Sequence, residues 1–506
     1  MRRSSSAIRS KIASTTVISG ITFIISFASQ MVISYHFGAS VELDAYWTAF
    51  ALMNVLAFPL TPLREALVPE LHRQLYLGGE SASAYFSRAM TLILMVAGMG
   101  CILAWLFASP LSGLAVSHKQ PEIKALSSRL LCWLAPAVVL VGISETLNSI
   151  LAAYNRVVLQ SFTRLLVAAS TLAILALFSG LLNSYVLPVA FMTAQIVTSF
   201  IQALALRRDG LAFRFMWPRG LGARYMEVSG ALLICYAASQ AYAILEKHTL
   251  TSFDAGLVSS FQYAVSLTNV LINVIGITVS SVFWPRFLDH AVSEDRGRLL
   301  AEIFVLSKFM LLIMGCLCAM TCINATALIE LVFARGAFDI DTVTRTASAL
   351  RVAVFAAIPI SIGFIIGRAL LSLGAVRSVM ATGIAMAMSG SITLVFAVVM
   401  NNADLAFSHW ILANLAGLAV QAVLLVKVCG RAEYMACGQI WWLIRWGGAM
   451  AVASVIAAAL PEPGHVYSPL IIDIILRSAV FCILFAILCW LFGIMRGLPS
   501  ILARKK

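Results

Sequence analysis

The sequence predicts an all-α polytopic membrane protein of about 14 transmembrane helices, with two pseudo-symmetric six-helix lobes plus two C-terminal helices. Hydrophobic residues make up 61% of its 506 residues and charged residues only 11%, with a mean hydropathy of +0.95. Soluble domains carry about 25% charged residues. Apolar stretches long enough to cross the hydrocarbon layer follow one another almost from end to end. No interval between them has room for a soluble catalytic domain.

The predicted helices are spread along the whole chain. They start near residues 14, 45, 87, 128, 158, 184, 227, 257, 308, 350, 377, 404, 439 and 468. The interval Phe333–Arg351 differs from the others, because Val343, Ala347 and Leu350 recur at helical spacing after a capping residue, either Asp341 or Thr342. This pattern predicts an amphipathic interfacial helix between the ninth and tenth spans.

Two similar segments lie 215 residues apart. Both contain an Asp-Ala turn, an Asn-Val-Leu run and, 15 or 16 residues after the asparagine, a proline. The matching residues are Asp44 and Asp254, Asn54 and Asn269, and Pro69 and Pro285. A second pair of prolines, Pro136 and Pro359, keeps nearly the same offset. Such a duplication predicts two halves that rock around a shared central site, and we expect each first-pair helix to end at its proline.

The repeat also predicts the domain organisation. An N-terminal lobe, residues 1–210, contains spans 1 to 6, and a C-terminal lobe, residues 211–430, contains spans 7 to 12. Residues 431–506 add spans 13 and 14 and a basic tail. Because six is even, both lobes have the same orientation, and the symmetry axis is expected along the membrane normal. The boundary falls in the most basic loop, Arg207–Arg224.

The net charge of +13 is explained by membrane topology. With a cytoplasmic N-terminus, 26 of the 35 Lys and Arg residues fall on the cytoplasmic side and 7 on the outer side. This bias follows the positive-inside rule and predicts that both termini are cytoplasmic. Nucleic acid is therefore not an expected partner.

Enzyme and cofactor signatures are missing from the sequence. It has no Walker loop, no HExxH, no GxSxG and no carboxylate pair within one span. The tightest cysteine cluster, Cys316, Cys318 and Cys322, has no nearby His or Asp to complete a metal site, and small apolar packing residues are expected there. We expect no enzyme activity, no cofactor and no metal.

Charged residues inside apolar spans are the strongest functional candidates, because a charge at that depth is costly. Arg368 either recognises a phosphate group or extends toward the cytoplasmic end of its span. Glu145 either carries a coupling proton or pairs with Arg368, since each follows its span's proline by nine residues. Asp473 and Arg477, four residues apart, either neutralise each other or contact substrate.

Four ordered segments resemble the MurJ/MviN family of lipid II flippases. They are FGASVELDAYWTAFALMN from Phe37, AGLVSSFQYA from Ala255, LVFARGAFD from Leu331 and GRALLSLG from Gly367. The family carries FGA…DAFFVAF at the first and LLFGRGAF-D at the third, and the resemblance covers about residues 10–430. It implies the fold of the multidrug/oligosaccharidyl-lipid/polysaccharide exporter superfamily, alternating access in the bacterial inner membrane, and a groove for a lipid tail at spans 13 and 14.

The resemblance also points to a cationic cavity that this chain has partly lost. Where the family has arginines in span 1 and an Asp-Arg pair in span 8, this chain has Phe23, Ser29, Tyr35, Val265 and Ser266. Charge remains at Arg368, at Arg64 and at Glu246-Lys247, where the family has Asp-Arg. A diphosphate needs cationic partners in a dry cavity, so a lipid-linked glycan other than lipid II fits this chain better.

The candidate residues form two sets. The expected substrate-binding residues are Arg368, Arg64, Glu145, Asn54, Asn269 and Asp44, and the expected ion-pair or coupling residues are Asp473, Arg477, Glu246 and Lys247. For Asn54 and Asn269 the alternative is that their amides hold helices together.

The sequence thus predicts a flippase for an undecaprenyl-diphosphate-linked oligosaccharide, either an exopolysaccharide or a peptidoglycan precursor. The alternatives are a cation-coupled multidrug exporter of the same superfamily and a non-transporting membrane scaffold for glycan synthesis. The expected partners are the lipid-linked glycan, the lipid bilayer and glycan-synthesis enzymes.

Overall fold

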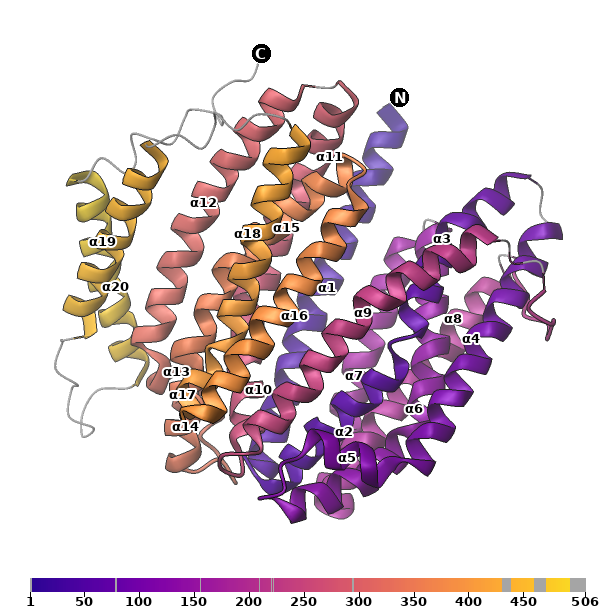
Figure 1. Ribbon diagram of the computed structural model, residues 1–506, viewed down its shortest axis with the longest axis horizontal. Coiled ribbons are helices and arrows are strands. Elements are labelled where there is room, and N and C mark those ends of the chain that lie inside the picture. The colour runs from indigo at the N-terminus through magenta and orange to yellow at the C-terminus, as the bar shows by residue number, and fades with distance from the viewer. Residues whose placement is uncertain are drawn as a thin grey trace. The chain divides into compact units, whose positions relative to one another are not determined.

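The computed structural model describes residues 2–77, 80–154, 156–208, 210–219, 221, 223–293, 295–429, 438–458 and 470–491. Within these residues the regular structure is entirely helical, as the apolar sequence predicts (Figure 1). By contacts the chain forms two compact units. The first comprises Met1–Ser259 and Arg335–Asp339, and the second comprises Ser260–Ala334 and Ile340–Lys506. These contact-based units divide the chain differently from the repeat, whose boundary at residue 210 stays a prediction.

The first unit contains the helices up to α9. They are α1 (Arg2–Phe37), α2 (Val41–Ala57), α3 (Leu60–Leu77), α4 (Glu80–Leu106), α5 (Ala108–Ala115), α6 (Pro121–Ala153), α7 (Val157–Leu182), η1 (Asn183–Tyr185), α8 (Val186–Arg208) and α9 (Ala223–Leu250). Helix α6 packs against α2, α4 and α8, and α7 packs against α1 and α8. Helix α9 contacts α3, which closes one side of the polar region described below.

The second unit contains the remaining helices, except that the first residues of α10, up to Ser259, belong to the first unit. They are α10 (Leu257–Leu271), η2 (Ile272–Ile277), α11 (Thr278–Val292), α12 (Arg296–Ile323), α13 (Ala325–Phe333), α14 (Ile340–Ala353), η3 (Val354–Ala356), α15 (Ala357–Ser372), α16 (Val376–Val399), α17 (Ala403–Phe407), α18 (His409–Cys429), α19 (Gly438–Ala458) and α20 (Leu470–Leu491). Helix α15 is central, with contacts to η2, α11, α12 and α18.

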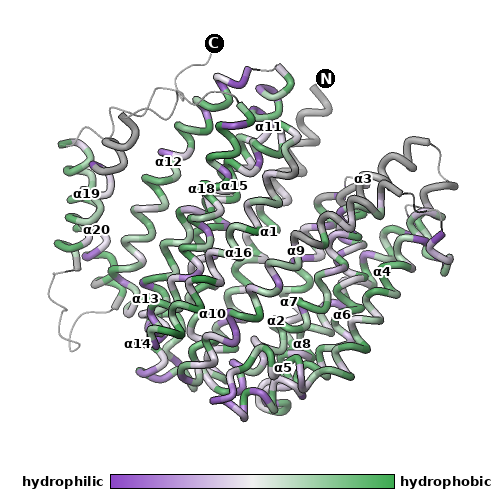
Figure 2. Tube along the Cα trace, viewed as in Figure 1, coloured by the Kyte–Doolittle hydropathy of each residue, from purple (hydrophilic) through white to green (hydrophobic). Residues whose placement is uncertain are grey.

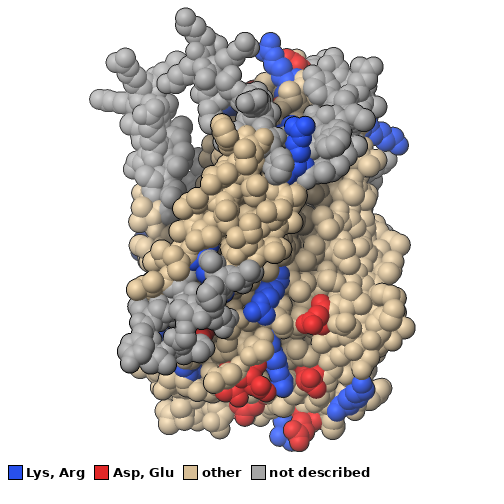
Figure 3. Space-filling model, turned by 90° about the vertical axis from the view of Figure 1, so that its left-hand side faces the viewer, with Lys and Arg blue, Asp and Glu red and all other residues tan. Residues whose placement is uncertain are grey.

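Ten helical stretches among the described residues are long and apolar enough to cross a membrane, or eleven if the bent pair α2 and α3 counts as one span. One of these stretches, Val158–Arg208, includes two consecutive helices, α7 and α8. Figure 2 shows hydrophobic residues along the lengths of the helices, with hydrophilic residues gathered mainly near their ends. On the described part of the face in Figure 3 most of the surface is uncharged, and the Lys, Arg, Asp and Glu side chains gather mainly near its middle and lower edge. The chain is a multi-pass membrane protein.

The prolines do not end their helices, contrary to our expectation. Helix α3 continues through position 69 to Leu77, and α11 continues through Pro285 to Val292. Helix α6 likewise contains Pro136, although no helix end was expected there. A proline removes one helical hydrogen bond, but in a membrane neighbouring helices and local adjustments compensate the freed backbone group. The interruptions lie elsewhere, between α2 and α3 and at the π-helix η2.

The predicted helix between the ninth and tenth spans is present as α14. Its Val343, Ala347 and Leu350 are buried, whereas Ile340 and Asp341 are exposed. The apolar spacing therefore identified the packed face of α14 correctly.

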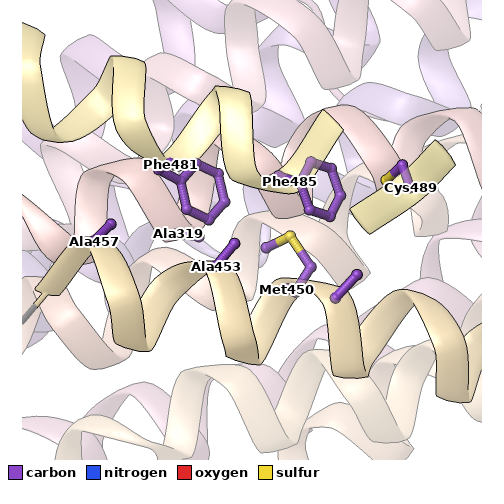
Figure 4. Close-up of a cluster of buried hydrophobic side chains, with 8 residues drawn as sticks. Ala319, Met450, Ala453, Ala457, Phe481, Phe485 and Cys489 are labelled. Carbon is purple, nitrogen blue, oxygen red and sulfur yellow. The ribbon is translucent and has the colours of Figure 1, made fainter. Parts of the chain in front are cut away.

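The two C-terminal helices pack on α12 through a cluster of small and aromatic side chains (Figure 4). The buried members are Ala319, Ala449, Met450, Ala453, Ala457, Phe481, Phe485 and Cys489. The alanines of α19 let the helices approach closely, and Phe481 stacks on Phe485 with ring centroids 5.8 Å apart. This packing attaches α19 and α20 to the second unit.

Candidate functional site

A polar cavity of about 240 Å³ lies within the first unit, between α2, α3, α6 and α9. It is lined by Asn54, Ala57, Phe58, Leu60, Thr61, Arg64, Val141, Gly142, Glu145, Thr146, Tyr236 and Gln240. Three predicted substrate-binding residues, Asn54, Arg64 and Glu145, thus come together at one site. Amide, hydroxyl and charged groups converge there in an otherwise apolar bundle, which is the usual character of a small-molecule site.

An ion pair across this cavity joins α3 to α6. Arg64 Nη1 donates to Glu145 Oε2 at 2.9 Å, and the two side chains are 22% and 49% exposed. The positive charge of Arg64 is therefore balanced locally. The predicted pairing of Glu145 with Arg368 stays a prediction.

A second polar contact joins α3 to α9. Tyr236 donates its hydroxyl hydrogen to Glu65 Oε1 at 3.0 Å. Neither residue was among the predicted candidates. The signal was present in the sequence, since Tyr236 and Gln240 are four residues apart and share a helix face.

The two repeated asparagines differ in surroundings. Asn54 is exposed at the cavity, and its Nδ2 donates to the carbonyl of Phe50 at 3.0 Å. Asn269 is half-buried on α10 in the second unit and does not line this cavity. The structure therefore brings only the first asparagine to the polar site.

Arg368 lies in the second unit on α15, with its guanidinium carbon 5.1 Å from the centroid of the Trp284 ring. The indole Nε1 donates to Ser372 Oγ at 3.2 Å, one helical turn beyond Arg368, which holds the ring against α15. Nη1 of Arg368 is buried and has no hydrogen-bond partner among the described residues. A buried guanidinium N–H without an acceptor is costly, so the hydrogen-bonding capacity of Arg368 is not fully used in this conformation.

Two buried oxygen atoms, one on α15 and one on the neighbouring α18, also have unused hydrogen-bonding capacity. Ser361 Oγ and Gln421 Oε1 are buried without a hydrogen-bond partner in the described part of the chain. The amide of Gln421 lies against α15, because a Cβ at Gly363 or Gly367 would come 3.3 or 3.6 Å from it. Within the second unit, α15 therefore carries or contacts several polar atoms whose bonding capacity is unused.

Asp44 is fully buried and holds the start of α10. Its carboxylate accepts hydrogen bonds from the backbone N–H groups of Gly256 at 2.6 Å and Ser259 at 2.7 Å, and from the Ser259 hydroxyl. A carboxylate is favourable here because the first N–H groups of a helix have no partner within the helix. Gly256 is required, since at φ +89° a Cβ would meet the carbonyl oxygen of Ala39 at 2.5 Å. Asp44 is not brought to the cavity.

The four predicted coupling residues lie on two helices, α9 and α20. Lys247 is buried and donates to Glu246 Oε1 at 2.7 Å near the end of α9. Arg477 is buried on α20, whereas the side chain of Asp473 lies outside the described residues, so their pairing stays a prediction.

No group of three His, Cys, Asp or Glu side chains suited to a metal ion occurs within the described ranges.

Comparison with protein families gives a match over most of the chain. A family model described as "Lipid II flippase MurJ" matches residues 33–476. A probable lipid II flippase MurJ of Borreliella burgdorferi is 22% identical over 351 residues, which cover 67% of this chain and 68% of the relative. A similarly described protein of Buchnera aphidicola is 21% identical over 352 residues, 66% of this chain and 67% of the relative.

Solved structures show the same fold. A lipid II flippase MurJ in an inward closed conformation has a TM-score of 0.76 and 16% identity, covering 94% of this chain and 98% of that one. An inward-facing multidrug resistance MATE family transporter of the MOP superfamily has a TM-score of 0.65 and 12% identity, over 82% of this chain and 96% of that one. Both likenesses are evidence of fold alone.

Proposed function

Because the chain belongs to the MurJ family of lipid II flippases, which are transporters rather than enzymes, we propose that it moves an undecaprenyl-diphosphate-linked glycan across the bacterial inner membrane. The cargo is a peptidoglycan or exopolysaccharide precursor, and the movement is by alternating access. Both termini lie in the cytoplasm, as the distribution of basic residues indicates.

The main observation in support of this proposal is the environment of the Arg368 side chain. A diphosphate that leaves water needs cationic hydrogen-bond donors, or several kcal/mol is lost. The guanidinium of Arg368 is held on the Trp284 ring, and its buried Nη1 has no acceptor within the described structure. Arginine presents paired N–H groups that match phosphate oxygens, so Arg368 is suited to bind the diphosphate.

The cavity of the first unit is suited to bind the sugar portion of the cargo rather than its diphosphate. Its lining combines amides and hydroxyls from Asn54, Thr61, Tyr236 and Gln240 with a charge-balanced ion pair. These groups match the many hydroxyls of a sugar better than they match a dianion, because Arg64 is already engaged by the Glu145 carboxylate. Arg64 becomes available to a phosphate only when Glu145 is protonated or displaced.

The test is a flipping assay with the full chain in proteoliposomes. Two fluorescent substrates are compared, lipid II and an undecaprenyl-diphosphate-linked exopolysaccharide repeat unit. The variants are Arg368→Ala, Arg368→Lys and the control Arg298→Gln, which removes an 80% exposed arginine side chain of the same unit. We expect Arg368→Ala to lower the rate at least tenfold, Arg368→Lys to lower it less, and Arg298→Gln to leave it unchanged.

The outcomes separate the alternatives. Movement of one glycan lipid and not the other identifies the cargo. Movement of neither lipid, together with cation-driven movement of a hydrophobic drug, would replace the proposal by a multidrug exporter. If the protein moves nothing but binds glycan-synthesis enzymes, it is a scaffold.

A further inference from the structure

The segment between the α8 and α9 helices has a structure of its own. Residues Leu211–Arg219, which we call the interfacial strap, form no helix or strand and follow directly on the arginine-rich end of α8 (Figure 1). The strap reads LAFRFMWPR, in which three aromatic residues and two arginines are interleaved.

Alternate residues of the strap are fixed to α4 through their backbone. The carbonyl of Ala212 accepts from Ser83 Oγ at 3.2 Å, the N–H of Arg214 donates to Ser87 Oγ at 3.2 Å, and the N–H of Met216 donates to Thr91 Oγ1 at 3.4 Å. Ser87 and Thr91 are buried, so these bonds are shielded from water. The strap is therefore held in place along the first turns of α4.

This attachment determines the depth of the strap in the membrane. The apolar part of α4 begins at Ser83, and Thr91 lies eight residues further along, about 12 Å at the rise of an α-helix. The 24-residue stretch Ser83–Leu106 is about 36 Å long and exceeds the hydrocarbon core of about 30 Å, so the strap lies beside the turns of α4 that are nearest the layer where headgroups meet acyl chains. On the predicted topology this is the cytoplasmic leaflet.

The side chains that the strap turns outward suit this layer. Phe213, Phe215 and Trp217 are 44%, 71% and 59% exposed, although they are large and apolar. Arg214 and Arg219 are exposed between and after them. Aromatic rings favour the membrane interface, and arginines beside them attract the anionic lipids of the cytoplasmic leaflet.

We propose that the interfacial strap is a binding surface for anionic phospholipid headgroups, with Phe215 and Trp217 inserted in the bilayer and Arg214 and Arg219 on the lipid phosphates. Two exposed arginines at the end of α8, Arg207 and Arg208, extend the same positive surface. The proposal concerns the surrounding lipid rather than the cargo, and it holds whichever glycan the protein moves.

Trp217 is the reporter in the test. The full chain is placed in nanodiscs of phosphatidylglycerol and phosphatidylcholine, with bromine atoms on the acyl chains of one lipid at a time. Bromine quenches a nearby indole, and the contribution of Trp217 is the difference between the wild-type chain and Trp217→Phe. We expect several-fold stronger quenching of Trp217 by brominated phosphatidylglycerol than by brominated phosphatidylcholine, with a preference that weakens as salt rises.

The double variant Arg214→Gln and Arg219→Gln should make quenching by the two lipids equal. Its matched control, Arg296→Gln and Arg298→Gln, removes two exposed arginines from the same predicted side and should keep the preference. Equal quenching in the wild-type chain, or a preference that survives loss of Arg214 and Arg219, overturns the proposal. No quenching by either lipid overturns it as well, and indicates that protein covers the strap.

Discussion

The two copies of the repeated segment carry the same asparagine and proline but differ in how the α-helix between them is interrupted. In the first copy α2 and α3 are separate helices that meet at 49°. In the second copy the chain stays helical through the π-helix Ile272–Ile277 between α10 and α11. A π-turn takes up one residue more than an α-turn, which matches the extra residue between Asn269 and Pro285. The shared asparagine and proline are therefore compatible with two different local helix geometries.

The aspartates of the two copies also differ. Asp44 is fully buried and binds the N–H groups at the start of α10, whereas Asp254 is exposed in the turn just before that helix. Both residues precede an Asn-Val-Leu run, but Asp44 lies in the first turn of α2, whereas Asp254 precedes α10. Burial, rather than position in the repeat, decides which carboxylate stabilises the structure.

The charges at matching positions beyond the repeat are opposite in sign. Glu145 follows Pro136 by nine residues and pairs with Arg64, while Arg368 follows Pro359 by nine residues and lies over Trp284. One unit thus has a balanced ion pair, and the other has a cation held on an aromatic ring.

The largest expected change in the free energy of unfolding results from substitution of the two aspartates. Asp44→Ala should lower the free energy of unfolding by roughly 3 kcal/mol, because it leaves two buried backbone N–H groups without an acceptor. Asp254→Ala, the matched control from the other copy, should change it by less than about 0.5 kcal/mol. Thermal denaturation of the full chain in detergent measures both. Equal shifts for the two variants would show that the copies are equivalent after all.

The next largest change in stability is expected from a substitution in the π-helix η2. A Cβ at Gly276 would lie 2.4 Å from Ser361 Oγ, so Gly276→Ala should destabilise the protein by about 1–3 kcal/mol through overpacking. Ser361 Oγ is buried without a hydrogen-bond partner in the described structure, so Ser361→Ala should cost little.

The same denaturation measurement tests this contact. The double variant Gly276→Ala with Ser361→Ala should recover part of the lost stability, because the clashing oxygen is gone. Gly98→Ala on α4 is the control, since a Cβ there meets nothing within 4 Å. A double variant no more stable than Gly276→Ala would show that the backbone, rather than Ser361, limits the space.

The smallest effect is expected at the ion pair of the first unit. Arg64 and Glu145 are partly exposed, so a double-mutant cycle with Arg64→Gln and Glu145→Gln should give a coupling energy of about 0.5–1 kcal/mol. Added salt should reduce this coupling. A coupling energy of zero would mean that the pair does not stabilise the fold, and would leave Glu145 open to the predicted pairing with Arg368.

Several features of the site could be predicted from residues alone. Glu145 and Asn54 were candidates because charged and amide groups are rare in apolar spans, and Arg64 was a candidate through the family resemblance. The structure brings all three to one cavity. Tyr236 was overlooked, since a tyrosine in a span is ordinary until its hydroxyl is seen bonded to Glu65. The pairing of Glu145 with Arg64 could not be predicted. It depends on the packing of α3 against α6, which the sequence of neither helix specifies alone.

The sequence by itself determined that this chain is a helical membrane protein of the MurJ family, together with most of its helices. The physical reason is local, because in lipid each backbone polar group must be satisfied within its own segment, and apolar length alone then specifies a helix. Only the tertiary structure decided the roles of the polar residues. The pairing of Arg64, the burial of Asp44 and the ring beneath Arg368 depend on distances between helices, and those distances follow from side-chain packing along the whole unit.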